Sequence, residues 1–178
     1  MSSAIFFDRD DTVIHNVPYN GDPKKVVLMP KAREALELLH GKGLSLFIAS
    51  NQSGVGRGYI TPEDVDNVNR EMERQLGKDY FRENLNCYAT DVEESPLRKP
   101  APGMLQDAAT RFGLDLKKSF MVGDRLSDIQ CGLAAGCKTV LVLGGTYVEE
   151  VEAARKIATH TASDLLAAAR WILENHEL

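Results

Sequence analysis

Residues 4–12 read Ala4-Ile5-Phe6-Phe7-Asp8-Arg9-Asp10-Asp11-Thr12, an apolar run that leads directly into two carboxylates one residue apart, Asp8 and Asp10. The apolar run predicts a short strand buried on both faces, as in a parallel sheet. In an open α/β sheet, ligands bind at the carboxyl ends of the strands. An acid at a buried strand end is costly unless a cation or a hydrogen-bond network receives it. The pair therefore indicates a metal site, a nucleophile, or both.

Short apolar runs of the same kind recur along the chain and alternate with segments of helical periodicity. Further strands are expected at residues 44–49, 85–89, 120–122 and 139–143. Helices are expected at residues 32–39, 62–76, 104–112, 126–135 and 165–173. This alternation predicts an α/β fold with a doubly wound parallel sheet.

Several helix ends carry recognisable signals. Thr61 followed by Pro62 and two acids is typical of a helix start, and Pro30 is expected at the first position of an earlier helix. Gly77, Gly113 and Gly136 are the expected C-terminal stops. The stretch 13–29 is rich in Pro, Gly and Asn, which is too irregular for a helix; it is interpreted as a hairpin or flap over the end of the first strand.

Length and composition bound the class of protein. The chain has 178 residues, enough for a single domain spanning residues 1–178, and its 43% apolar and 26% charged residues are ordinary for a globular protein. The net charge of -5 argues against nucleic acid as the main partner.

No run approaches the roughly 18 apolar residues that span a membrane, and no signal peptide is visible. Cys87, Cys131 and Cys137 form no CxxC pair. We therefore expect reduced thiols in a cytoplasmic protein with no membrane partner.

Four segments with polar side chains each follow a strand-like run: residues 8–12, 50–54, 98–100 and 123–128. The carboxyl ends of parallel strands point the same way, so these segments are expected to converge on one crevice. They contribute carboxylates, a hydroxyl, amides, a lysine and arginines. Carboxylate oxygens suit Mg²⁺, and the remaining groups suit a phosphate. Such a set favours phosphoryl transfer, in which catalysis is mostly positioning and charge stabilisation.

These segments, in this order, resemble the haloacid dehalogenase superfamily of phosphohydrolases: DxDxT, a strand-ending Ser, a Lys before Pro, and GDxxxD. The resemblance covers roughly residues 4–145. It implies a Rossmann-like fold with a flap and a minimal cap, because no insertion is long enough for a separate cap domain. Within the superfamily, NQSGVGRG, RKPAPGML and VGDRLSD resemble the small phosphatases that act on D-glycero-D-manno-heptose 1,7-bisphosphate, to which the histidinol phosphatases are close relatives.

The resemblance implies a role for each matching position. Asp8 would attack phosphorus and form an aspartyl-phosphate, while Asp10 would protonate the leaving oxygen and then activate water. Asp8, the backbone carbonyl of Asp10, and Asp124 would hold Mg²⁺. Asp8 attacks only while ionised, a state that the metal and Lys99 favour. Contacts to the phosphoryl group are implied for Ser50, Lys99, Asn51 and Arg98, and contacts to the wider substrate for Gln52, Ser53, Arg57 and Arg125.

The chain departs from the family pattern in two places. Asp11 stands where the family usually has Gly; Asp tolerates left-handed backbone better than most residues, but an added carboxylate would alter metal affinity, and a degenerate, non-catalytic site is the alternative. Many relatives hold a structural zinc before the Lys. Here Cys87 lacks the partner ligands, and one thiol cannot build a four-ligand site. We therefore expect no structural zinc and a shorter specificity loop over residues 90–97.

The preferred substrate is a sugar bisphosphate, because the motifs follow the heptose group and the arginines suit a second phosphate. Histidinol phosphate is the alternative. It is favoured only by an acidic cluster, Asp91, Glu93 and Glu94, which is otherwise a solvated loop face. Residues 54–58 are either a flexible turn or a substrate loop carrying Arg57. A non-catalytic phosphate-binding protein is the alternative from another class, and a monomer is favoured.

Overall fold

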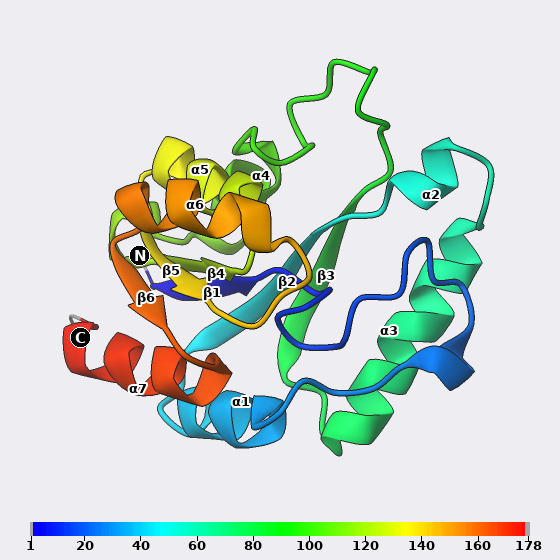
Figure 1. Cartoon of the computed structure of the whole chain (residues 1–178). Coiled ribbons are helices and arrows are strands. Elements are labelled where there is room, and N and C mark those ends of the chain that lie inside the picture. Colours follow the sequence, from blue (N-terminus) through cyan, green and yellow to red (C-terminus); the bar gives the residue numbers. More distant parts are fainter. Residues whose placement is uncertain (1, 177–178) are drawn as a thin grey trace.

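The computed structural model describes residues 2–176 and contains one sheet of six parallel strands in the order β3-β2-β1-β4-β5-β6 (Figure 1). The strands are β1 (Ala4–Phe7), β2 (Ser45–Asn51), β3 (Phe81–Cys87), β4 (Phe120–Gly123), β5 (Lys138–Val142) and β6 (His160–Ala162). The predicted doubly wound α/β fold is confirmed. The strand order reverses beside β1, and such a switch point is where open α/β sheets bind their ligands.

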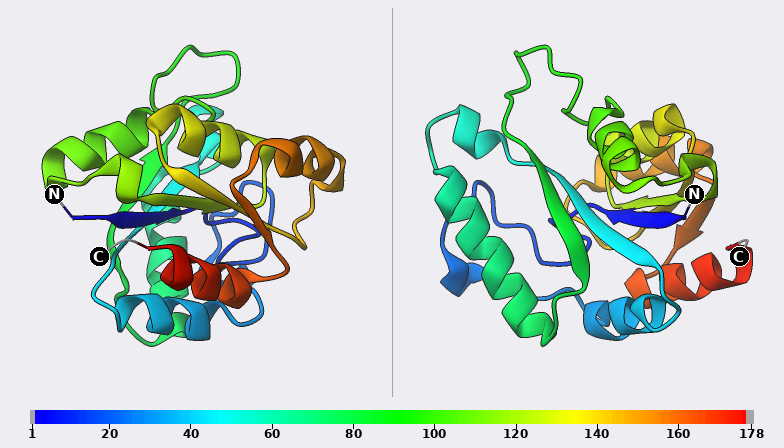
Figure 2. Two further views of the ribbon diagram at one scale, coloured as in Figure 1. Left: turned by 90° about the vertical axis from the view of Figure 1, so that its left-hand side faces the viewer. Right: turned by 180° about the vertical axis from the view of Figure 1, so that it is seen from behind.

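Helices cover both faces of the sheet (Figures 1 and 2). One face carries α4 (Gly103–Phe112), α5 (Leu126–Ala135) and α6 (Val151–Ile157). The other carries α1 (Ala32–His40), α3 (Pro62–Leu76) and α7 (Leu165–Asn175), and the short α2 (Ser53–Gly56) follows β2. The sheet is therefore buried between two helical layers, which leaves its strand ends as the place where polar groups can gather.

Strand β1 is buried on both faces, as its unbroken apolar run predicted. Ile5 and Phe7 belong to the apolar cluster beneath α1, α3 and α7. Phe6 points to the opposite side and joins the cluster beneath α4 and α5, where its ring stacks on Phe47 at 5.3 Å. Successive side chains of a strand point to opposite faces, so the four residues fill two cores at once.

Most of the predicted helix ends are confirmed. Thr61 Oγ1 accepts a hydrogen bond from Asp64 N, the carboxylate of Asp64 accepts one from Thr61 N, and the helix ends at Gly77 with a φ of 82°. The prediction for Pro30 was wrong. Lys31 adopts a left-handed backbone with a φ of 62°, and α1 begins only at Ala32. A left-handed residue between Pro30 and the helix prevents the proline from joining it.

The irregular stretch 13–29 is a flap with the expected hairpin character. Ile14 pairs with Leu28 in an antiparallel bridge, and His15 N donates to Val27 O at 2.8 Å. A short 3₁₀ helix, η1 (Pro23–Lys25), lies within it.

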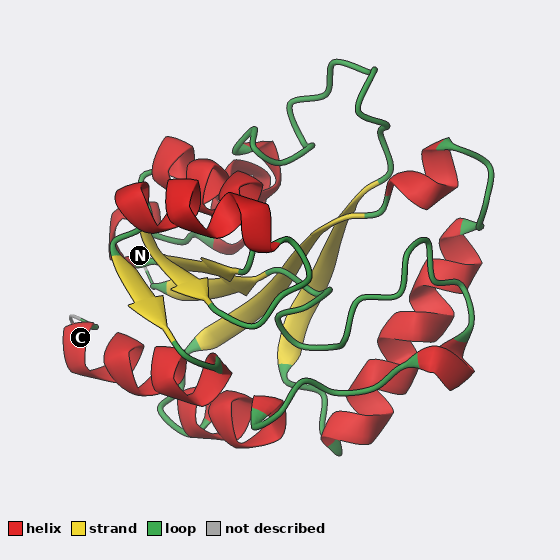
Figure 3. Cartoon of the chain, viewed as in Figure 1, coloured by secondary structure: helices red, strands yellow, loops and turns green. Residues whose placement is uncertain are grey.

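Sequence patterns did not predict three short elements, α2, α6 and β6, and they placed the start of β3 four residues late. Each missed element is too short for a periodic signal. The segment between β3 and α4 is loop and projects beyond the carboxyl ends of the strands (Figure 3). Within residues 2–176, no helix combines the length and the apolar character needed to cross a membrane.

Candidate active site

The predicted site residues meet at the carboxyl ends of β1, β2 and β4. Asp8 follows β1 directly, and its N–H donates to Val122 O of β4 at 2.9 Å. Ser50 and Asn51 close β2, and Asp124 follows β4. Because these three strands are neighbours in the sheet, residues far apart in the sequence share one site at the switch point.

Lys99 is the central cation of the site. It is only 4% exposed, and its Nζ lies 2.8 Å from Oδ1 of Asp8 and 2.6 Å from Oδ1 of Asp128. Burial acts to lower the pKa of Lys99, but the carboxylates of Asp128 and Asp8 raise it above its ordinary value. Lys99 therefore remains an ammonium group that neutralises part of the buried negative charge.

Three buried carboxylates, Asp8, Asp124 and Asp128, each place an oxygen within 4.8 Å of the others. Oδ2 of Asp124 has no hydrogen-bond partner among residues 2–176. Burial, together with the charges of Asp8 and Asp128, raises the pKa of Asp124 to about 9. Unpartnered buried oxygens in a carboxylate cluster are the donor set that a hard cation such as Mg²⁺ takes. The residues present thus fit a divalent cation.

The metal set inferred from the sequence was Asp8, the Asp10 carbonyl and Asp124. The structure adds Asp128, which sequence reasoning did not single out. Asp128 lies in the first turn of α5, where its Oδ2 accepts a hydrogen bond from Arg125 N at 3.0 Å, and it is 1% exposed. Its signal was present as the second acid of the GDxxxD pattern, residues 123–128.

The carboxylate of Asp10 has different neighbours from that of Asp8. Its Oδ2 accepts hydrogen bonds from Gln52 Nε2 at 3.0 Å and from Arg9 Nε at 3.3 Å. Burial raises the pKa of Asp10, and the Arg9 guanidinium opposes this rise only in part. Asp10 therefore retains a proton to higher pH than an ordinary aspartate does, which suits an acid–base group.

Arg9 and Asn69 form a buried support for Asp10 that the sequence did not suggest. Arg9 is 1% exposed, and its Nη1 donates to Oδ1 of Asn69, in α3, at 2.9 Å. Nδ2 of Asn69 has no partner among the described residues. A side-chain amide in a helix gives no signal of this role before the fold is known.

Ser50 and Asn51 both form hydrogen bonds with other residues of the site. Ser50 Oγ accepts a hydrogen bond from Gln52 Nε2 at 2.7 Å. Asn51 Nδ2 donates to Lys99 O at 3.0 Å, and its Oδ1 accepts from Lys99 N at 3.0 Å. Asn51 thus fixes the backbone that carries Lys99, and the predicted contact of Asn51 with the phosphoryl group stays a prediction.

A cavity of about 300 Å³ opens above these groups. The predicted site residues that line it are Asp8, Asp10, Asn51, Gln52, Ser53, Arg57, Arg98, Lys99 and Arg125. Ser50 and Asp124 do not line the cavity, because both are almost completely buried beneath it, at 1% and 3% exposure.

Besides the buried Arg9, three arginines line this cavity, and each has a partner within the chain. Arg57 forms an ion pair with Asp91, and Arg98 Nη1 donates to Ala89 O at 2.9 Å. Arg125 Nε donates to Glu150 at 3.2 Å, and its guanidinium lies 3.7 Å from the centre of the Tyr147 ring. Arg57 and Arg125 are therefore part of the cavity wall rather than isolated surface charges.

Two of the three acids in the loop cluster, Asp91 and Glu93, also have partners within the chain. Asp91 is the partner of Arg57, and Glu93 accepts hydrogen bonds from Thr90 N and Oγ1. All three acids of the cluster, Asp91, Glu93 and Glu94, are exposed. The three acids line a second pocket, but they are exposed and two of them already have partners, which favours the solvated loop face.

Comparison with known proteins places the chain in a family. Residues 96–168 match the HAD-hydrolase-like family model. The D-glycero-β-D-manno-heptose-1,7-bisphosphate 7-phosphatase of Mesorhizobium japonicum is 34% identical, over 93% of this chain and 81% of the relative. The D-glycero-D-manno-heptose-1,7-bisphosphate 7-phosphatase of Chlorobaculum tepidum is 31% identical, over 94% of this chain and 92% of the relative. The chain belongs to the HAD-like phosphatases. It is a phosphoric monoester hydrolase, so the non-catalytic alternative is not supported.

Solved structures of other HAD-like phosphatases have the same fold. A D,D-heptose 1,7-bisphosphate phosphatase from B. bronchiseptica, crystallised with magnesium and phosphate, superposes with a TM-score of 0.88 at 28% identity over 97% of this chain and 99% of that one. A HAD-like phosphatase from Mesorhizobium loti gives a TM-score of 0.80 at 32% identity, over 96% and 87%. The Rossmann-like fold expected for this HAD-like phosphatase is therefore confirmed along nearly the whole chain.

Proposed function

We propose that this HAD-like phosphatase removes the 7-phosphate of D-glycero-D-manno-heptose 1,7-bisphosphate in a Mg²⁺-dependent reaction that passes through an aspartyl-phosphate on Asp8. The observation that carries the proposal is the position of Asp8 in the wall of the cavity, 2.8 Å from the Lys99 ammonium and beside two further buried carboxylates. A nucleophile, a fixed cation and a cation-binding cluster thus meet where a phosphate ester can enter.

In the first step, an oxygen of the Asp8 carboxylate attacks phosphorus, and the bond between phosphorus and the sugar oxygen breaks. The Lys99 ammonium is placed to bind the oxygens of the transferring phosphoryl group, because its Nζ already contacts the nucleophile. Ser50 and Arg98 are proposed to contribute the remaining donors. The step is mostly positioning and charge stabilisation.

Asp10 is proposed to be the acid and base. In the first step its carboxyl proton passes to the leaving sugar oxygen. In the second step Asp10 takes a proton from a water molecule whose oxygen attacks the aspartyl-phosphate, so that Asp8 is regenerated and inorganic phosphate leaves. Hydrogen bonds from Gln52 and Arg9 keep the Asp10 side chain in one orientation at the cavity wall.

Asp8, Asp124 and the Asp10 carbonyl are proposed to hold Mg²⁺, with Asp128 close to the same cluster. When bound, the ion would neutralise negative charge on the phosphoryl oxygens and keep Asp8 ionised. This assignment agrees with the buried Oδ2 of Asp124, which has no hydrogen-bond partner among the described residues.

The bisphosphate is favoured over histidinol phosphate by the charges around the cavity. Arg57, Arg98 and Arg125 line it and are proposed to bind the second phosphate. Asp91 is the one acid of the loop cluster that lines this cavity, and it is already paired with Arg57, so the loop cluster offers this cavity no free carboxylate for the amine of histidinol phosphate. We further propose that the chain acts as a single-domain monomer, because one chain supplies all of these residues.

Phosphate release tests the proposal directly. The wild-type protein is incubated with Mg²⁺ and the heptose bisphosphate, fructose 1,6-bisphosphate or histidinol phosphate, and kcat/KM is measured for each. We expect the heptose compound to be the best substrate, and Asp8→Asn to reduce its turnover by at least about 10³-fold, as for loss of a nucleophile. A higher kcat/KM for histidinol phosphate would overturn the substrate assignment, and undiminished activity of Asp8→Asn would overturn the mechanism.

A further inference from the structure

Asp11, the residue that replaces the usual glycine of the motif, has the backbone conformation that a glycine would take. Its φ is 60°, in the left-handed region. Asp is one of the few side chains that enter this region, yet glycine does so without strain. The backbone therefore gains nothing from Asp11, and any advantage of this residue must come from its carboxylate.

The Asp11 carboxylate is buried, and both of its oxygens accept hydrogen bonds. Asp11 is 5% exposed, and its Oδ1 accepts a hydrogen bond from Asn16 N in the flap at 2.9 Å. Its Oδ2 accepts two hydrogen bonds from Thr146, one from the backbone N–H at 2.8 Å and one from Oγ1 at 2.5 Å. Hydrogen bonds to an ionised acceptor are stronger than neutral ones. Asp11 thus ties together two loops that are far apart in the sequence.

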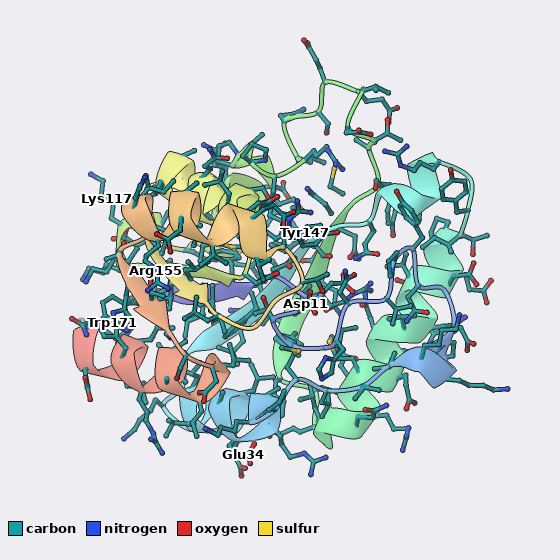
Figure 4. All side chains as sticks on the ribbon, in the orientation of Figure 1. Asp11, Glu34, Lys117, Tyr147, Arg155 and Trp171 are labelled. Atoms are coloured by element: carbon teal, nitrogen blue, oxygen red, sulfur yellow. The ribbon has the colours of Figure 1, made fainter. Side chains whose placement is uncertain are left out.

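Thr146 lies in the loop that follows β5, residues 143–147, and both of its neighbours touch the site. Gly145 packs so closely on the Asp124 carboxylate that a Cβ there would collide with it. Tyr147 lines the cavity and carries the Arg125 guanidinium over its ring. Asp11 and Tyr147 lie at the same end of the sheet in Figure 4. The hydrogen bonds that hold Thr146 therefore also restrain its neighbour Tyr147, whose ring supports the Arg125 guanidinium.

We propose that Asp11 is a positioning residue that holds the 143–147 loop against the site, so that Tyr147 presents Arg125 to the part of the substrate remote from the transferred phosphoryl group. The inference rests on the proposed function for the identity of the substrate, but the loop contact itself does not. A glycine at this position cannot make the contact, because it has no side chain.

Hydrogen exchange measures the loop contact without any activity. In Asp11→Gly, we expect the amides of Thr146 and Asn16 to exchange at least about tenfold faster, because opening a hydrogen-bonded amide governs its exchange. Amides of α7, which packs beside α1 on the face of the sheet opposite α5 and α6, are expected to keep their rates. Thr146→Val should reproduce part of the increase, and Thr146→Ser, which retains the hydroxyl, should not. Unchanged exchange at Thr146 in Asp11→Gly would overturn the proposal.

Steady-state kinetics separate positioning from a loss of structure. We expect Asp11→Gly to raise KM for the heptose bisphosphate by about 2- to 30-fold, the usual range for coupling through a loop, with kcat little changed. For p-nitrophenyl phosphate, which has no second anionic group, KM should stay the same. In an Arg125→Met background, Asp11→Gly should have no further effect on either substrate.

The outcomes are distinguishable. A parallel loss of kcat on both substrates would show a general structural role and would overturn the positioning role of Asp11. Absence of phosphate release from every ester by the wild-type protein would contradict the proposed function instead, and the exchange rates would then decide the loop contact by themselves.

Discussion

Nζ of Lys99 lies 2.6 Å from Oδ1 of Asp128, closer than the 2.8 Å that separates it from Asp8. Both side chains are almost completely buried, at 2% and 1% exposure. Lys99 comes from the loop before α4, and Asp128 from the first turn of α5. Their contact holds the Lys99 ammonium beside Asp8, the proposed nucleophile, so Asp128 helps to set the position of the proposed phosphoryl-binding cation.

Replacing Lys99 by Met should destabilise the protein and inactivate it. The substitution keeps most of the side-chain volume but leaves Asp8 and Asp128 without their shared cation. Removing one partner of a buried pair costs about 3–5 kcal/mol, so we expect a loss of that order in urea unfolding without Mg²⁺, and a smaller loss with it. Lys118→Met, at an exposed position, is the matched control. Equal stabilities for the two variants would contradict the account.

Replacing Asp128 by Asn tests the residue that the sequence analysis overlooked. The amide keeps the shape but removes a charge from the cluster and weakens the hold on Lys99. We expect the half-saturating Mg²⁺ concentration for phosphate release to rise by about 10- to 100-fold, as when a residue that supports metal ligands is lost. Asp107→Asn, exposed on α4, should leave it unchanged. An unaltered Mg²⁺ requirement in Asp128→Asn would exclude Asp128 from the site.

Stability should depend on pH much more strongly without a divalent cation than with one. Burial raises the pKa of Asp124 from 3.8 to about 9. Without a cation the folded state thus holds more protons than the unfolded state between these values, and the free energy of unfolding falls as the pH rises through that window. We expect Tm in EDTA to fall between pH 6 and 9.

With saturating Mg²⁺ the same carboxylates are ionised in the folded state, so the fall in Tm should largely disappear. Thermal scans at several pH values, with Mg²⁺ and with EDTA, measure both curves. In EDTA, Asp124→Asn should make the fall in Tm with pH less steep. Part of the fall should remain, because burial also raises the pKa values of Asp8 and Asp10. A Tm that rises with pH in EDTA would be inconsistent with a buried protonated cluster.

Gly145→Ala should impair the metal site from a neighbouring loop. An added Cβ would meet Oδ2, Cβ and Cγ of Asp124, so the carboxylate or the loop must move. We expect weaker Mg²⁺ binding, measured by calorimetry, and phosphatase activity reduced by about tenfold or more, since small displacements of catalytic groups are costly. Gly41→Ala, at the end of α1 and before the amino end of β2, is the control and should retain activity.

Asn69→Leu tests the buried support of the proposed acid–base group. The substitution leaves a nitrogen of the Arg9 guanidinium without its acceptor, at a position that is 1% exposed. An unsatisfied buried donor costs about 1–3 kcal/mol, so we expect that loss in urea unfolding, together with a lower kcat as Asp10 loses its fixed orientation. Asn67→Leu, on the same helix and partly exposed, should show neither effect; full activity of Asn69→Leu would rule out the support.

Local sequence patterns predicted elements wherever a periodic signal was long enough. The bounds of β1 and α5 agree with the sequence ranges, and the capping box at Thr61 and the glycine stops follow from local chemistry that needs no tertiary partner. The strand β6 gave no such signal: it has three residues, His160 to Ala162, and only its pairing with β5 makes it a strand.

The residues of the candidate site likewise divide into those that local sequence patterns predict and those that depend on tertiary contacts. Asp8 and Asp124 stand directly after strand-like runs, so their convergence follows from the parallel sheet alone. Lys99 lies in the loop between β3 and α4, and hydrogen bonds with Asn51 hold its backbone at the site. Arg9 and Asn69 act through a contact between elements that only the folded chain reveals. Asp128 belongs to the GDxxxD pattern of the sequence, but its contact with Lys99 appears only in the folded chain.

For this protein, the sequence by itself determined the fold class, the strand ends that bear the chemistry and the family, because buried apolar runs, helix caps and motif spacings are local properties of the chain. Only the tertiary structure decided which charges share partners: the Lys99–Asp128 contact, the paired state of the rim arginines, and the use of Asp11 to hold the loop at Thr146. The physical reason is that hydrogen bonds and ion pairs depend on distances of about 3 Å between residues remote in sequence, and the packing of the sheet and helices sets those distances.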